Sequence, residues 1–148
     1  MNERLDPAQA LAIARDARTR MARHAGTPRW YAPLYGLGSG AMVASLAFRG
    51  PAQMGIMVAG LLGISALYAK WSRDSGLSVN GYRRGRTLPI TIGLLAAALL
   101  AIGIALRVRD IPGYGWAPLA CGAVFGVVSA LASAAWDRRW IADIEDGR

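Results

Sequence analysis

The residues most able to do chemistry lie in one stretch, from Arg73 to Arg86, which holds four arginines and an Asn80-Gly81 pair. Guanidinium groups bind phosphate, so this stretch could contact a nucleic acid, a nucleotide or lipid headgroups. A nucleotide-binding loop would need a strand, a glycine-rich turn with lysine and then a helix, and this context is missing. Asn80-Gly81 favours a tight turn. We therefore expect a solvated turn whose arginines can also contact phosphate groups.

Other candidate groups are scattered along the chain. Asp74, Asp110 and Asp137 each neighbour an arginine, which favours a paired or solvated carboxylate over a catalytic one. His24 has no second metal-type residue at suitable spacing. Cys121, the single cysteine, lies within an apolar segment and reads as a buried packing thiol. We therefore assign no catalytic, cofactor-binding or metal-binding residue, and we expect no cofactor.

The elements that position these groups are apolar. The chain has 148 residues, 54% of them hydrophobic, and a formal charge of +8. Four blocks contain no charged residue: Tyr31–Phe48, Ala52–Ala69, Leu88–Leu106 and Gly115–Trp136. Helices in soluble bundles need a polar face, which these blocks lack. Each block approaches the length needed to cross the hydrocarbon core of a bilayer, about 30 Å. We predict an all-α integral membrane four-helix bundle, with spans at about residues 31–48, 52–70, 88–107 and 115–136.

The basic residues predict the orientation. Lysine and arginine accumulate on the cytoplasmic side of membrane helices. Four spans place residues 1–29, the loop 71–87 and the tail 138–148 on one side; together with Lys70, the last residue of the second span, they hold fourteen of the 17 basic residues. We therefore predict a multi-pass protein of the bacterial plasma membrane with both termini cytoplasmic. The basic loop would contact the headgroups of anionic lipids through four candidate residues: Arg73, Arg83, Arg84 and Arg86.

The first 29 residues predict an amphipathic helix at the membrane interface. Asp6 and Pro7 form a helix-start pattern. Beyond them, alanines recur on one side at helical spacing and arginines on the other. The apolar face is thin, so it could bind the membrane, a partner helix or the protein's own loops.

Small residues recur at intervals of four in every span and predict close helix packing. The predicted packing glycines are Gly36, Gly40, Gly55, Gly63, Gly122 and Gly126. Four such stripes exceed the need of one compact bundle, so one of them could face a second copy or a partner membrane protein. Aromatic residues recur near the span boundaries, and we interpret them as interfacial anchors.

The overall layout carries a resemblance. Sixteen arginines accompany one lysine, the spans are rich in alanine, and Pro28-Arg29-Trp30-Tyr31 leads into the first span. With the basic central loop, the chain resembles uncharacterised small four-span integral membrane proteins of actinobacterial type. This resemblance covers the layout only, implies a bacterial origin and transfers no site.

The function predicted from these features is a structural or accessory role through helix packing and basic cytoplasmic surfaces. The alternatives are a small transporter or channel component acting as an oligomer, and a lipid-modifying membrane enzyme. Small four-helix multidrug exporters carry a membrane-embedded carboxylate, whereas the predicted spans here do not. Binding of nucleic acid is disfavoured, since lipid headgroups explain the basic loop more simply.

The basic loop is expected to help set the topology. Changing Arg83, Arg84 and Arg86 together to glutamine should weaken or invert the orientation, because it removes basic residues that are retained on the cytoplasmic side. Reporter fusions at the two termini measure the orientation. An unchanged distribution of both reporters would contradict a role for this loop.

Overall fold

The computed structural model describes residues 9, 11–13, 16, 26–76 and 87–145. Within residues 26–145 the described elements are α2 (Tyr31–Ala44), η1 (Ser45–Ala47), α3 (Pro51–Ser75), α4 (Leu88–Val108) and α5 (Ala117–Glu145). The described part of the chain is helical and contains no strand, which confirms the all-α class. The predicted N-terminal helix lies largely outside the described residues. The five of its residues that the structure describes, 9, 11–13 and 16, are helical.

Proline and glycine mark the helix boundaries. Pro51 is the first residue of α3, and Pro89 is the second of α4. Proline is tolerated in a first turn because its missing N–H would have no partner there. Gly50 and Gly76 flank α3 with φ angles of 68° and 66°, a left-handed region that glycine adopts without steric cost. These residues limit α3 to one continuous helix of 25 residues.

Three helices are long and apolar enough to cross a membrane: α3, α4 and residues 117–143 of α5. This agrees with a multi-pass membrane protein. Their most apolar 18-residue windows are 0%, 6% and 17% buried, respectively, within the protein. Most of this apolar surface therefore faces outward, as in a protein whose solvent is lipid. Helix α2 has 14 residues and continues into η1.

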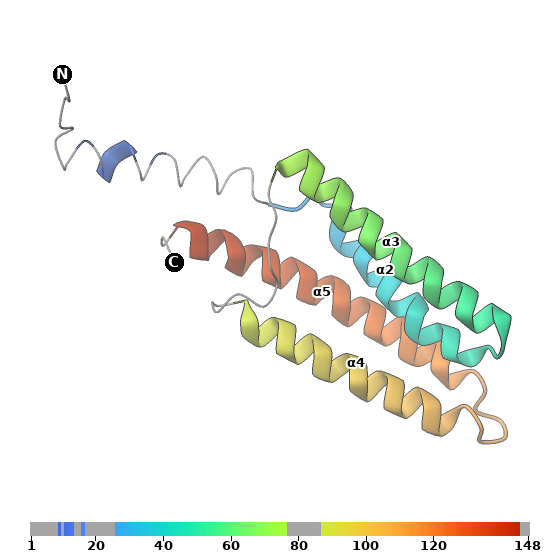
Figure 1. Cartoon of the computed structure of the whole chain (residues 1–148). Coiled ribbons are helices and arrows are strands. Elements are labelled where there is room, and N and C mark those ends of the chain that lie inside the picture. Colours follow the sequence, from blue (N-terminus) through green and yellow to red (C-terminus); the bar gives the residue numbers. More distant parts are fainter. Residues whose placement is uncertain (1–8, 10, 14–15, 17–25, 77–86, 146–148) are drawn as a thin grey trace.

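The helices lie side by side in the order α3, α2, α5, α4 (Figure 1). The most extensive contact joins α2 to α5; α3 packs chiefly on α2, and α4 chiefly on α5. Helices α3 and α4 follow each other in the chain but lie on opposite flanks of the central pair. The arrangement is thus an open row around the α2–α5 pair.

The central pair is held by backbone contact. A Cβ atom added to Gly40 would lie 2.6 Å from the Gly122 carbonyl oxygen, and one added to Gly122 would lie 2.6 Å from the Ala44 Cβ atom. Both distances are too short for any side chain. Gly36 and Gly126 make the same kind of contact one turn along. Such close approach is how helices associate in lipid, where no hydrophobic drive brings them together.

The contact between α2 and α3 is reciprocal. A Cβ atom on Gly38 would lie 2.9 Å from Ile64 Cγ1, and one on Gly60 would lie 2.6 Å from Met42 Cγ. Each glycine therefore accommodates a large side chain of the other helix. Apart from Trp71, which is buried, the remaining residues of α3 are exposed or partly exposed.

A carboxylate ties the segment before α2 to α5. Asp137 accepts hydrogen bonds from the Thr27 backbone N–H, at 3.0 and 3.2 Å to its two oxygens, and from the Thr27 hydroxyl at 3.0 Å. These groups are partly buried, which limits competition by water. Hydrogen bonds to a charged group each contribute about 1.5–3 kcal/mol.

Replacing Gly40 by alanine should destabilise the protein by about 1–3 kcal/mol, because a methyl group cannot fit against the Gly122 carbonyl. The matched control is Gly63→Ala on α3, where nothing lies within 4 Å of the added atom. Thermal unfolding in nanodiscs measures both. Equal midpoints for the two variants would contradict the central role of the α2–α5 contact.

Replacing Asp137 by alanine should lower stability by about 2–3 kcal/mol, since it leaves the Thr27 N–H without its acceptor. Thr27→Ala removes only the hydroxyl bond and should cost less. The exposed neighbour Arg138, changed to alanine, is the control. If Asp137→Ala lowers the unfolding midpoint no more than Arg138→Ala does, the hydrogen bonds between Thr27 and Asp137 do not stabilise the fold.

Candidate functional site

The predicted headgroup residues are only partly described by the structure. Arg73 lies in the last turn of α3 with an exposed side chain. Arg83, Arg84 and Arg86 lie outside the described residues. Near Arg73, the Lys70 ammonium pairs with Asp74 at 2.9 Å and lies 6.0 Å from the centre of the Trp30 ring. A lipid-binding role for the arginines therefore stays a prediction.

The six predicted packing glycines separate into two groups. Gly36 and Gly40 of α2 lie against Gly122 and Gly126 of α5. Within the described part of the chain, Gly55 and Gly63 of α3 have no atom within 4 Å of an added Cβ atom, so open space lies beside both. The predicted stripes of α2 and α5 thus meet each other, whereas the stripe of α3 faces outward.

The glycines of the α2–α3 contact were not predicted. Gly38 and Gly60 each precede a large apolar residue by four positions, Met42 and Ile64. This spacing places a small and a large residue on the same helix face. A search for complementary small and large pairs, instead of small residues alone, could have found this contact.

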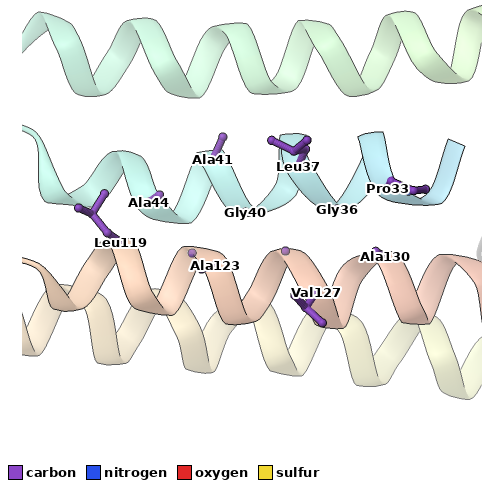
Figure 2. A pocket seen from close by; sticks show the side chains of 12 residues that line it. Pro33, Gly36, Leu37, Gly40, Ala41, Ala44, Leu119, Ala123, Val127 and Ala130 are labelled. Carbon is purple, nitrogen blue, oxygen red and sulfur yellow. The ribbon is translucent and has the colours of Figure 1, made fainter. Parts of the chain in front are cut away.

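A groove follows the seam between α2 and α5 (Figure 2). Gly36 and Gly40 contribute no side chain to it, and Leu119 and Val127 of α5 are among its lining residues. The groove has a volume of about 420 Å³ and an almost entirely apolar lining. It therefore offers contact to hydrocarbon but no group that could perform catalysis.

A second pocket, of about 260 Å³, lies where all four helices converge, and we call it the aromatic pocket. The start of α2, the end of α3, the start of α4 and the second half of α5 all contribute to it. Its lining residues are Thr27, Tyr31, Tyr35, Tyr68, Trp71, Ile90, Thr91, Leu94, Ala132, Ser133 and Trp136. None of these side chains carries a charge at neutral pH.

The rings of the aromatic pocket contact one another across helices. The Trp71 ring centroid lies 5.9 Å from that of Tyr68 and 6.5 Å from that of Tyr31, both in tilted arrangements. Tyr31 and Tyr35 stack at 6.3 Å, one turn apart on α2. These distances are typical of favourable ring pairs. The residues interpreted as separate interfacial anchors therefore form one cluster.

Trp71 lies within the protein instead of in the lipid interface. Its side chain is 4% exposed, and its indole N–H has no hydrogen-bond partner in the structure. By contrast, Tyr68 is 38% exposed. The i, i+3 spacing of Tyr68 and Trp71, with the i, i+4 spacing of Tyr31 and Tyr35, places each pair on one helix face. That spacing was the available signal for a shared cluster.

Cys121 is partly buried and packs against the small hydrophobic core of Val43, Leu46, Ala105 and Phe125. Among the described residues, no group of three or more histidine, cysteine, aspartate or glutamate side chains is placed to hold a metal ion. No protein-family model, curated protein or solved structure matches this chain.

Proposed function

We propose that this chain is a four-span protein of the bacterial plasma membrane with a structural or accessory role. In this proposal it binds another membrane helix through the outward face of α3. That helix belongs either to a partner protein or to a second copy of the chain. The single observation that carries the proposal is the unpaired small-residue face of α3.

The α3 face differs from the other three small-residue stripes. The small-residue stripes of α2 and α5 pack against each other. The alanine stripe of α4 packs at the core against α5, through Ala97, Ala101 and Ala105. On α3, Gly55 and Gly63 have open space beside them and Ala59 is exposed. A face of this kind lets a second helix approach closely in lipid, and no described residue of the chain packs beside these two glycines.

A fourth crossing by α2 is supported by its length and its neighbours. Fourteen α-helical residues and three 3-10 residues extend about 27 Å, close to the thickness of the hydrocarbon core. Helix α2 also lies between α3 and α5, both of which are long enough to span. A helix packed between two spans must lie at their depth, which favours four crossings and both termini on the cytoplasmic side.

The basic segments complete the proposal. With the termini inside, the end of α3 that carries Arg73 lies at the cytoplasmic surface, together with the loop that holds Arg83, Arg84 and Arg86. Anionic headgroups attract such arginines by about 1 kcal/mol each. These contacts would hold the protein at a defined depth and leave the α3 face available within the bilayer.

Cross-linking in membranes tests the α3 face. In a Cys121→Ala background, a single cysteine at Ala59 should cross-link to a second copy or to a partner, seen as one defined heavier band. The added variants Gly55→Leu and Gly63→Leu should remove most of that product, because their side chains block close approach. Native mass spectrometry of the purified species then distinguishes a homo-oligomer from a hetero-complex.

The matched controls lie on α4. A cysteine at Leu99, which is 64% exposed, should give no defined product, and Gly93→Leu should leave the Ala59 product unchanged. If the Ala59 and Leu99 cysteines react alike, or if the product survives both leucine substitutions on α3, the proposed interface is wrong.

A further inference from the structure

The aromatic pocket has no role in the proposed function. It lies near the end of the helices where α2 and α4 begin and α3 ends. Five of its eleven lining residues are aromatic, and they come from α2, α3 and α5: Tyr31, Tyr35, Tyr68, Trp71 and Trp136. The groove between α2 and α5, by contrast, is lined by glycine, alanine, proline, leucine and valine. The aromatic pocket therefore differs in chemistry from a gap between aliphatic side chains.

The rings of the aromatic pocket meet at different angles. The planes of Tyr31 and Tyr35 are nearly parallel, at 7° to each other. The Trp71 ring is tilted by 59° from the Tyr31 ring and by 43° from the Tyr68 ring. Because Trp71 is only 4% exposed, it supports these two rings and offers little surface of its own. Tyr31, Tyr35 and Trp136 are partly exposed and Tyr68 is 38% exposed, so a bound group can contact them.

An aromatic lining without charged side chains favours one class of cation. The faces of aromatic rings carry partial negative charge and attract cations, most strongly where water is excluded. A primary ammonium ion is strongly hydrated, and in this pocket it would find no carboxylate in the lining to replace its water. A quaternary ammonium ion has no N–H group and presents only methyl or methylene groups. It therefore loses no hydrogen bonds when it enters.

A carboxylate lies one hydrogen bond away from the lining. The Thr27 hydroxyl, which belongs to a lining residue, donates to Asp137 at 3.0 Å, and these groups are partly buried. Water screens such a charge less than it screens an exposed one, such as that of Arg138. At the same end of the helices, the Lys70 ammonium is paired with Asp74. The charge of Asp137 thus favours a cation over a neutral molecule of the same shape.

We propose that the aromatic pocket binds a quaternary ammonium group, carried either by a free small molecule or by the choline headgroup of a lipid. The methyl groups contact the rings of Tyr31, Tyr68 and Trp136. The volume of the pocket, about 260 Å³, is below the range of sites for drug-sized ligands, roughly 300–1,000 Å³, and suits a small organic ion. This site goes beyond the proposed function and does not require a partner for α3.

A pair of ligands with the same shape tests the recognition of charge. The full-length protein is reconstituted in nanodiscs whose lipids lack choline headgroups. Calorimetric titration compares choline with its neutral carbon isostere, in which a tert-butyl group replaces the trimethylammonium group. A pocket that recognises only apolar shape prefers the isostere, because no charge has to leave water. We expect choline to bind more tightly by roughly tenfold or more, since several rings favour the charged form. Equal or weaker binding of choline, or no binding of it, would overturn the proposal.

Tyrosine variants locate the site. Tyr68→Leu removes a ring and should weaken choline binding by roughly three- to tenfold, the loss of about one cation–π contact. Tyr68→Phe keeps the ring and should retain the affinity. The matched control is Tyr114→Leu, because Tyr114 is 51% exposed, lies in the connection between α4 and α5 and does not line the pocket. An equal loss in Tyr68→Phe and Tyr68→Leu, or in Tyr114→Leu and Tyr68→Leu, would contradict the assignment.

The lipid composition then distinguishes the two sources of the ligand. If the group belongs to a lipid, nanodiscs of a choline phospholipid should abolish the binding of free choline, whereas those of the matching ethanolamine phospholipid should not. If the ligand is a free molecule, both kinds of nanodisc should give the same affinity. The Ala59 cross-link, measured in the same samples, is independent of choline. Its loss with a normal preference for choline would reject only the proposed α3 interface.

Discussion

The contact between the backbones of α2 and α5 is the constraint on which the rest of the structure depends. Gly40 and Gly122 approach so closely that neither position admits a Cβ atom. In lipid, apolar side chains gain little by leaving their surroundings, so dispersion contacts and packing must hold helices together. A seam of glycine and alanine gives the largest number of such contacts. It makes α2, the shortest of the helices α2 to α5, one of the two central helices of the fold.

The position of the outer helices follows from this seam. Because one face of α2 is covered by α5, α3 packs on another face of α2, where Gly38 of α2 and Gly60 of α3 form the contact. Helix α4 attaches to α5 through its alanine face at Ala97 and Ala101. The outer helices are therefore held on opposite flanks. The aromatic pocket lies near the end of the helices where α2 and α4 begin and α3 ends. Side chains from four helices converge there without filling the space.

Polar contacts lie at the two opposite ends of the helices, beyond the close packing in the middle. At one end, Asp137 binds the Thr27 segment to α5 through hydrogen bonds of 3.0–3.2 Å. At the other, Arg49 and Asp110 pair between the connection after η1 and the connection after α4. The latter side chains are largely exposed, and such pairs contribute little. Between these two ends the helices are held by close packing, and most of their apolar surface faces outward.

Much of the fold could be predicted from the sequence by itself. A charge-free run from Leu88 to Leu106 forms a helix that a bilayer accommodates, whatever its neighbours are. Proline and glycine at Pro51 and Gly76 limit α3 by local backbone geometry alone. These properties depend on residues close in the chain, so composition and spacing were sufficient to predict them.

The partners of each helix face were decided only by the tertiary structure. Gly36 and Gly40 have the same kind of spacing in the sequence as Gly55 and Gly63, yet the first pair is packed and the second faces outward. Trp71 reads as an interfacial anchor but lies buried between Tyr31 and Tyr68. Spacing defines the face of a helix on which a residue lies. Which helix packs on that face depends on contacts between residues far apart in the chain. The spacing of residues along one helix carries no information about those contacts.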